Sequence, residues 1–308
     1  MNTEVQTAVQ TWANSLSDLI PVLKGIDTRT KMSDIRDAYA TMLAQNPAPA
    51  GVTFQAVDMG GVPGTLVTPA QIKTDAVVMY IHGGAYIVGR PDGYHGIGGN
   101  YANMLGARVY MPDYRLAPEH PFPAPIDDTL CAYAWLLEQN MPANRIAFVG
   151  ESAGGAMVVS VMVAAKSKGL PLPAVGSSIS PWANLEHTGA SMSNREGLDP
   201  LNSKAVLDIL ARTFLGDTLA SHPLASPVFA DVTGLPPILV QIGENELMLS
   251  DAMRLATHLA DNRVRVNLEV WPAMFHAWHF YAAILPQGRQ ALESSVRFIE
   301  HGLAEANR

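Results

Sequence analysis

Two patterns of hydrophobic positions divide the chain near residue 50. Apolar residues recur at helical spacing in the first twenty positions, at Val5, Val9, Trp12, Leu16, Leu19 and Ile20. Pro21 interrupts this period, a second helical stretch spans 33–43, and the Pro-rich run 46–51 breaks the pattern again. We therefore predict that residues 1–50 form two cap helices attached to a main domain over 51–308.

Beyond residue 51 the pattern changes to that of strands alternating with helices. Alternation around Gly60-Gly61 predicts a hairpin, with strands at 52–58 and 62–68. Short apolar runs predict further strands at 76–81, 108–111, 145–149, 174–180, 238–242 and 264–271. Helical stretches lie between them at 94–105, 124–138, 153–168, 250–262 and 288–301. Continuous Val/Ile runs alternating with helices predict an α/β fold whose sheet is mostly parallel and covered on both faces.

One interval, at about 183–233, breaks this alternation. It contains a single helical stretch at 203–214 and no convincing strand. A connection of that length is either a lid or disordered. Its apolar residues favour an ordered lid, among them Leu201, Val206, Leu207, Ile209, Leu210, Phe214 and Leu215. We therefore predict that this interval is a second part of the cap.

Composition and charge narrow the class of protein. The 308 residues are 48% hydrophobic and 16% charged, which suits a large core and not a disordered chain. The net charge of −8, without any Lys/Arg run, disfavours nucleic acid as a partner. A single cysteine, Cys131, excludes an intramolecular disulfide and a Cys-based zinc site. We expect neither a signal peptide nor an integral membrane segment, and hence a cytoplasmic location.

The strongest chemical signal is Gly150-Glu-Ser-Ala-Gly154, which follows a predicted strand and opens a predicted helix. A serine on such a tight turn has a strained backbone, and the glycines allow the chain to pass close to itself. The helix N-terminus also places positive partial charge near the reacting oxygen. This context favours Ser152 as a nucleophile over a serine that merely happens to lie in a glycine-rich turn.

A second signal, His82-Gly83-Gly84-Ala85, directly follows the strand at 76–81. Consecutive small residues after a strand let backbone N–H groups point into a cleft. Alone, this run would be better explained as a glycine turn with a structural histidine. Together with the serine turn about seventy residues later, it is typical of a loop that binds an oxyanion.

A serine nucleophile at neutral pH needs a base. Among nine histidines, His276 lies just past the last predicted strand and before the final helix. This position matches the order serine, acid, histidine along the chain. His279, three residues further on, is the competitor, and we prefer His276 because it lies closer to the strand end, in a predicted loop.

The base in turn needs a carboxylate that holds its tautomer. Glu244, Glu246 and Asp251 all follow the predicted strand at 238–242. We favour Glu246, which lies four residues beyond the end of that strand. Asp251 is the alternative, although its position fits the start of the next helix.

Three segments together resemble the bacterial hormone-sensitive lipase family of esterases. They are His82-Gly-Gly, Asp113-Tyr-Arg-Leu-Ala-Pro-Glu-His-Pro-Phe-Pro-Ala124 and Gly150-Glu-Ser-Ala-Gly-Gly155. The long second segment is the most specific of the three. The match is strong over about 75–180 and moderate over the acid and histidine region. The Trp-Pro-x-Met-x-His run that ends at His276 is similar to a branch that includes monoterpene lactone hydrolases.

This resemblance implies an α/β-hydrolase fold with a helical cap over a serine esterase site. It implies Ser152 as nucleophile and His276 as base, and it supports Glu246, because the spacing between acid and histidine is similar to that in the family. It further implies that an oxyanion hole is formed by Gly83, Gly84 and Ala153. Neither a metal nor an organic cofactor is expected.

Three positions depart from the family pattern. Ala85 replaces the usual third glycine of the His-Gly-Gly-Gly loop, which is harmless if that residue does not need a positive φ. Glu151 stands before the serine where Asp is usual. Glu246-Leu-Met stands where the family has Asp-Pro-Leu, so a longer side chain must reach the histidine.

We therefore expect a carboxylesterase that acts on small to medium esters or lactones through an acyl-enzyme. The alternatives are amide or carbamate hydrolysis at the same site and a non-catalytic ligand-binding receptor of the same fold. We predict that apolar side chains contact the substrate, chiefly Tyr86, Trp182, Phe214, Met248 and Trp278, with Trp12 and Phe280 as further candidates. The last strand and the final helix are candidates for a homodimer interface.

Overall fold

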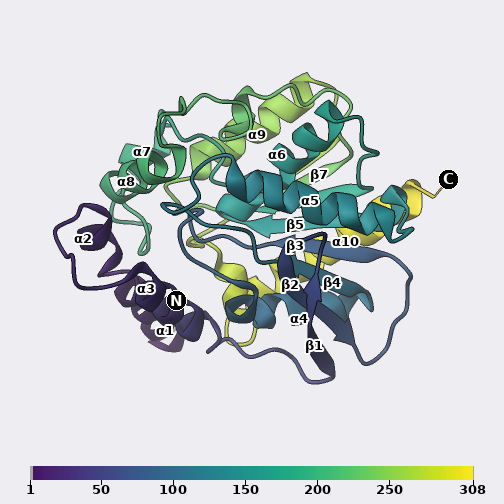
Figure 1. Ribbon diagram of the computed structural model, residues 1–308, viewed down its shortest axis with the longest axis horizontal. Helices are drawn as coiled ribbons and strands as arrows, with labels where there is room; N and C mark the ends of the chain where they lie inside the picture. Colours follow the sequence, from purple (N-terminus) through teal and green to yellow (C-terminus); the bar gives the residue numbers. More distant parts are fainter. Residues whose placement is uncertain (1–2, 308) are drawn as a thin grey trace.

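The central feature of the computed structural model, which describes residues 3–307, is a mixed β-sheet (Figure 1). Within these residues eight strands form one sheet in the order β1-β2-β4-β3-β5-β6-β7-β8. Its strands are β1 (Val52–Asp58), β2 (Pro63–Pro69), β3 (Val77–Ile81), β4 (Arg108–Pro112), β5 (Ile146–Glu151), β6 (Val175–Ile179), β7 (Ile238–Gly243) and β8 (Val266–Trp271). β2 pairs with β1 and β4 in antiparallel register, and all other pairs are parallel.

Burial along the strands explains the two sequence patterns. β3, β5, β6 and β7 are buried at every residue, as expected of strands with helices on both faces. β1 lies at one edge of the sheet and is half-exposed, so its polar and apolar residues alternate. The turn from β1 to β2 uses Gly60 and Gly61, which have φ of 71° and 93° and so suit a glycine at each position.

Helices cover both faces of the sheet and confirm the predicted α/β class. They are α4 (His95–Leu105), α5 (Ala124–Glu138), α6 (Ala153–Ser167), α9 (Leu249–Asp261) and α10 (Pro286–Glu305). α4 and α10 pack together on one face, and α5, α6 and α9 lie on the other (Figure 1). Within residues 3–307, no helix combines the length and hydrophobicity needed to span a bilayer.

The N-terminal segment contains three helices, so the prediction of two was wrong. They are α1 (Thr3–Ser15), α2 (Leu19–Leu23) and α3 (Met32–Leu43). Pro21 does interrupt the first helical period, but it lies inside the short α2. A proline is tolerated there because the N–H groups of a first helical turn have no intrahelical acceptor.

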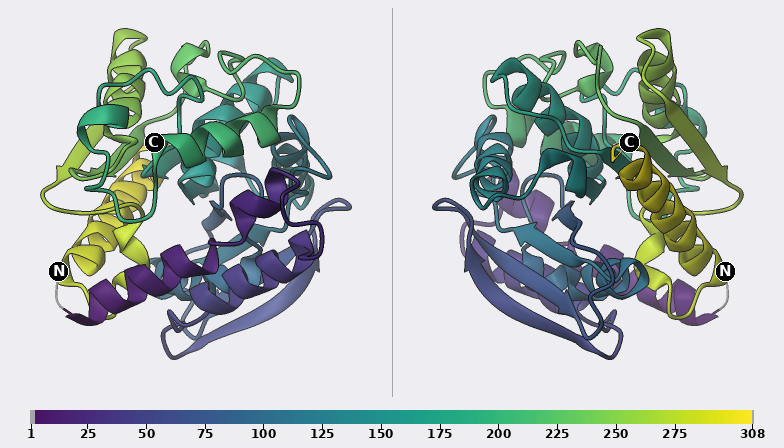
Figure 2. Two further views of the ribbon diagram at one scale, coloured as in Figure 1. Left: turned by 90° about the vertical axis from the view of Figure 1, so that its left-hand side faces the viewer. Right: turned by 90° about the vertical axis from the view of Figure 1, so that its right-hand side faces the viewer.

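The predicted insert between β6 and β7 is ordered and helical. It contains α7 (Ser191–Asn194), α8 (Lys204–Leu215) and a 3₁₀ turn at Pro227–Phe229. The Ser203 hydroxyl caps α8 by accepting the Val206 N–H at 3.3 Å. α2 packs against α8, and the left view of Figure 2 shows the purple N-terminal helices beside this green helix. The division of the chain into cap and catalytic domains stays a prediction.

Candidate active site

Ser152 occupies a sharp turn between β5 and α6, with φ of 58° and ψ of −121°. Its own N–H donates to the Ile179 carbonyl at 2.9 Å, which fixes the turn to the neighbouring strand. A Cβ on Gly154 would collide with the carbonyl oxygens of Ile81 and His82. Only glycine therefore lets α6 begin so close to β3, and the serine is raised at the carboxyl edge of the sheet.

His276 and Glu246 meet at the same edge of the sheet. His276 Nδ1 and Glu246 Oε2 lie 2.8 Å apart, and the Glu246 side chain is fully buried. The other oxygen, Oε1, accepts the Ser180 hydroxyl at 2.8 Å and the Gly243 N–H at 2.6 Å. These three hydrogen bonds satisfy the carboxylate and fix its orientation, so the longer glutamate reaches the histidine where the family pattern has aspartate.

Asp251, the alternative acid, lies elsewhere. It belongs to the first turn of α9 and is fully buried, and no hydrogen bond joins it to His276 among the described residues. Burial raises the pKa of Asp251 well above its ordinary value, which favours a neutral side chain. The geometry thus pairs His276 with Glu246 and not with Asp251.

The surroundings of His276 set its proton affinity. Burial alone would lower the pKa of the imidazole, but the hydrogen bond and negative charge of Glu246 outweigh burial and raise that pKa above its ordinary value. Asp199 and Glu151 add to the effect through their charges. His276 is thus a stronger base than a free imidazole.

The competing histidine has other partners. His279 lies in the 3₁₀ turn at Trp278–Tyr281, and its Nε2 lies 2.9 Å from the Gln241 side-chain oxygen. Burial lowers the pKa of His279 to about 3, so it stays neutral. It serves as part of a buried polar network beneath β7 and β8.

Ser152 and His276 line one pocket, but among the described residues no hydrogen bond joins the Ser152 hydroxyl to the imidazole. Hydrogen bonds between catalytic groups are often long in unliganded sites and shorten when substrate binds. Ser152 and His276 therefore lie at the same pocket, and we expect their hydrogen bond to form when substrate binds.

The oxyanion loop differs from its prediction at Gly83. The Gly83 N–H donates to Glu151 Oε1 at 2.5 Å, so it is not free to bind an oxyanion, and that expectation was wrong. Gly84 and Ala85 follow it and line the pocket. Ala153 is the first residue of α6, where the backbone N–H has no intrahelical acceptor. The free donors are therefore those of Gly84, Ala85 and Ala153.

Ala85 does adopt a positive φ, at 55°. An L-residue other than glycine pays about 1 kcal/mol in this left-handed region. The replacement of the usual glycine by Ala85 therefore costs conformational free energy, because this position does need a positive φ. The Ala85 N–H is still present at the pocket. The loop is strained and needs support from its surroundings.

Glu151 supplies part of that support, a role that the sequence did not reveal. Its Oε1 holds the Gly83 N–H, and its Oε2 accepts the Tyr80 hydroxyl at 2.7 Å. Burial raises the pKa of this carboxyl to about 8. Its position directly before Ser152 was the available signal, because a buried carboxylate there can reach backbone donors of the facing strand end.

The family-specific segment 113–124 also supports the loop. The Tyr114 hydroxyl donates to the His82 carbonyl at 2.6 Å, and its ring stacks on the imidazole with centroids 4.1 Å apart. The Ala117 N–H donates to the Tyr86 carbonyl at 2.9 Å. His82 is fully buried, and burial lowers its pKa to about 4, in keeping with the structural role predicted for it.

The pocket above Ser152 is roofed by both cap segments. It holds about 510 Å³ of empty space, including its open mouth, and is lined mainly by apolar side chains. The N-terminal segment contributes Trp12 of α1, Leu16 of the following turn, Leu19 of α2 and Tyr39 of α3, and the insert contributes Leu201, Asn202 and Leu210. Trp12 and Phe280 line the pocket as predicted. The sequence did not reveal that Leu16, Leu19, Tyr39, Val88 and Asn202 line the pocket, because hydrophobic periodicity does not distinguish a pocket wall from ordinary core.

Five other predicted contacts are absent from the pocket lining. They are Tyr86, Trp182, Phe214, Met248 and Trp278, each of them at most 1% exposed. That these side chains contact substrate stays a prediction, and their burial fits the tendency of large apolar residues near a site to pack into the core as readily as into a pocket.

Comparisons with known proteins identify the family and the fold. A family model described as alpha/beta hydrolase fold matches residues 78–280. An acetyl-hydrolase from Streptomyces hygroscopicus is 38% identical over 257 residues, covering 80% of this chain and 86% of that protein. An esterase from Acinetobacter venetianus is 29% identical, with 86% of each chain covered. The crystal structure of an esterase from the bacterial hormone-sensitive lipase family is similar, with a TM-score of 0.90, 37% identity, and coverage of 98% and 99%.

Proposed function

Because this chain belongs to the bacterial hormone-sensitive lipase family of α/β-hydrolase-fold esterases, we propose that it hydrolyses small to medium carboxylic esters through an acyl-enzyme on Ser152. It is a carboxylesterase-like serine hydrolase. The observation that carries the proposed mechanism is the 2.8 Å contact between His276 Nδ1 and Glu246, at the pocket that Ser152 also lines.

In the first half of the reaction, Ser152 Oγ attacks the ester carbonyl carbon while His276 Nε2 takes the hydroxyl proton. The resulting oxyanion accepts hydrogen bonds from the N–H groups of Gly84, Ala85 and Ala153. The bond to the leaving oxygen then breaks, and His276 gives its proton to the departing alcohol. Ser152 is left as an acyl ester.

In the second half, water attacks the acyl carbon and loses a proton to His276 Nε2. The second oxyanion collapses and expels Ser152 Oγ, which takes that proton back. Glu246 stays ionised throughout, orients the imidazole and stabilises its protonated form. The net reaction turns one ester and one water into an acid and an alcohol.

The pocket favours small, mainly apolar acyl groups. Its walls offer Leu16, Leu201 and Leu210 to an acyl chain, as expected of a small-molecule site lined mainly by apolar side chains. A lactone would react in the same way, except that its leaving alcohol would stay attached to the acyl group. A homodimer through β8, whose outer edge has no partner strand in the described residues, stays a prediction.

The purified chain is expected to hydrolyse p-nitrophenyl acetate and p-nitrophenyl butyrate far faster than p-nitroacetanilide. The anilide is harder to cleave because its leaving group needs a proton before it can depart. A radiolabelled organophosphate should attach to Ser152 in equimolar amount, as located by peptide mass spectrometry. A folded chain that is neither labelled nor active on either ester would support a receptor, and faster anilide cleavage would support an amidase.

The pH dependence of kcat/KM should report the raised pKa of His276. The imidazole must be neutral to act as a base, so activity is lost as the pH falls through its pKa. Since Glu246 raises that pKa, the acidic limb should have its midpoint above the free-imidazole value of about 6.5. In Glu246→Gln the limb should move to lower pH. An unmoved limb in blank-corrected p-nitrophenyl acetate assays would contradict this assignment.

A further inference from the structure

Four aromatic rings follow one another near the active site, and we call them the aromatic column: His187, Trp182, Tyr86 and Phe214. Centroid separations are 5.7 Å for His187 and Trp182, 6.1 Å for Trp182 and Tyr86, and 3.7 Å for Tyr86 and Phe214. All four side chains are buried. Because none of them lines the pocket, substrate contact does not explain the column.

Two members of the column are joined directly to the catalytic backbone. The backbone N–H of Trp182 donates to the Ser152 backbone carbonyl at 3.0 Å. Tyr86 follows Ala85, and both residues have left-handed backbones, with φ of 63° and 55°. Such conformations cost free energy and persist only where the surrounding packing holds them. The backbone of the column is therefore attached to both sides of the site, to the serine turn through Trp182 and to the oxyanion loop through Tyr86.

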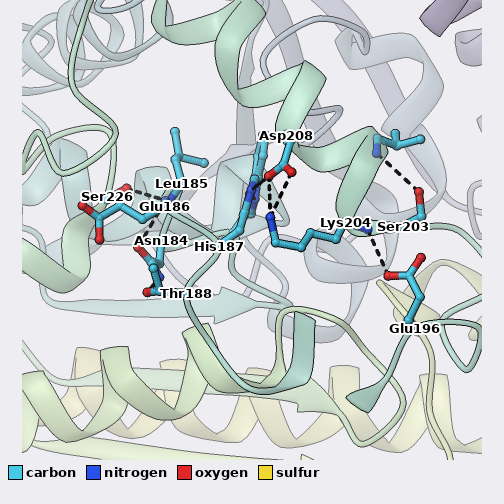
Figure 3. Close-up of polar contacts among 12 residues, drawn as sticks. Asn184, Leu185, Glu186, His187, Thr188, Glu196, Ser203, Lys204, Asp208 and Ser226 are labelled. Carbon is cyan, nitrogen blue, oxygen red and sulfur yellow. Dashed lines mark hydrogen bonds and ion pairs between the residues drawn. The ribbon is translucent and has the colours of Figure 1, made fainter. Parts of the chain in front are cut away.

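His187 ends the column with two polar contacts that fix its tautomer. The Trp182 indole can only donate, and its Nε1 lies 2.8 Å from His187 Nε2, so Nε2 must carry a lone pair. The proton then lies on Nδ1, which donates to Asp208 Oδ1 at 2.7 Å (Figure 3). Burial lowers the pKa of His187, in keeping with a neutral ring.

The cap helix α8 holds both ends of this column. Asp208 on α8 binds His187 at one end, and Phe214 on the same helix stacks on Tyr86 at the other. Lys204, one turn before Asp208, fixes the carboxylate from the solvent side, with Nζ 2.9 Å from Oδ2 (Figure 3). The Phe122 N–H donates to the Phe214 carbonyl at 2.8 Å and anchors the far end of the helix.

We propose that His187 and Asp208 are positioning residues for ester hydrolysis: they lock the aromatic column to α8, and the column holds the oxyanion loop in its strained, productive conformation. This inference rests on the proposed function of Ser152. It assigns the cap a part in transition-state stabilisation besides its part in lining the pocket. Its signature is therefore a loss in kcat with little change in KM.

The test compares Asp208→Ala with Asp208→Asn in the full-length chain. The asparagine keeps an oxygen that can accept from His187 Nδ1, whereas the alanine removes it. For p-nitrophenyl acetate we expect kcat to fall about tenfold in Asp208→Ala, because a small shift of an oxyanion donor weakens its bond in the transition state. KM should stay within about twofold, and Asp208→Asn should retain kcat within about threefold. A change in KM alone, or equal losses in both variants, would overturn the proposal.

Two further variants keep the test independent of folding. His187→Asn suits the left-handed backbone of that position, φ 51°, but is too short to reach Trp182 and Asp208 together, so it should match Asp208→Ala. Lys166→Met removes the surface pair of Lys166 with Asp231, 2.8 Å apart, and should leave kcat unchanged. Thermal melting must show all four variants folded at the assay temperature.

The outcomes separate this inference from the proposed function. If the wild-type chain cleaves no ester, the proposed function fails. If the wild type is active and Ser152→Ala is not, yet folded His187→Asn and Asp208→Ala keep wild-type kcat, only the inference fails. A lowered melting temperature with unchanged kcat would mean a purely structural role for the column and would also overturn it.

Discussion

Replacing Ser152 with alanine is expected to abolish ester hydrolysis, with kcat falling by about 10⁶-fold, the loss typical of a deleted serine nucleophile. The variant keeps the pocket and the donors of Gly84 and Ala153, so a small residual rate above that of water should persist. Alanine has no hydroxyl to acylate, and the organophosphate label should therefore disappear. Steady-state kinetics with p-nitrophenyl acetate and mass spectrometry of the labelled protein measure both effects.

The fold of the Ser152→Ala chain should survive. The alanine adopts the same left-handed turn, at a similar cost to the serine, and the backbone bond from residue 152 to Ile179 is kept. A melting temperature near that of the wild type is the control. Wild-type turnover in a folded Ser152→Ala chain would mean that another residue is the nucleophile.

Glu246→Gln is the second change with a large expected effect, about 10⁴-fold in kcat. The amide is nearly isosteric with the carboxylate, but it cannot stabilise an imidazolium and can offer an N–H where His276 needs an acceptor. Both the tautomer and the basicity of His276 are thereby lost. KM for p-nitrophenyl acetate should change little, because the fully buried Glu246 does not contact substrate.

Asp251→Asn is the matched control for this change. Asp251 is buried like Glu246, but it makes no hydrogen bond to His276 among the described residues, and burial raises its pKa well above the ordinary value, which favours the uncharged form that an amide imitates. We expect kcat within a few-fold of the wild type. The reverse result, a large loss in Asp251→Asn and a small one in Glu246→Gln, would move the role of acid to Asp251.

Local patterns in the sequence were enough to predict the architecture and the main site candidates. Turn glycines and strand runs depend on residues near one another in the chain, and the order of Ser152, Glu246 and His276 matches the order of nucleophile, acid and base known for the fold. Gly154, for example, is required by the close approach of α6 to β3, and this requirement is visible as a glycine two residues after the serine. The parallel sheet then brings strand ends together without further information.

The details that sequence reasoning missed depend on contacts between distant residues. Glu151 reaches the Gly83 N–H across 68 positions and so removes that group from the oxyanion donors. Tyr86, Trp182 and Phe214 look like pocket residues, but they stack on one another and face the core. Tertiary packing decides whether a large apolar side chain lines the pocket or lies in the core, and hydrophobic periodicity does not distinguish the two.

The roof over Ser152 has a consequence for how substrate range can diverge. Trp12 of α1 lies beside the His276 ring, with centroids 6.4 Å apart, while Glu246 and His276 make their mutual hydrogen bond from the far half of the chain. Exchange of the first forty-odd residues would thus reshape the acyl-binding walls and leave proton transfer intact. Substitutions in the N-terminal segment can therefore change the substrate range, and substitutions in the C-terminal half can separately change the rate of proton transfer.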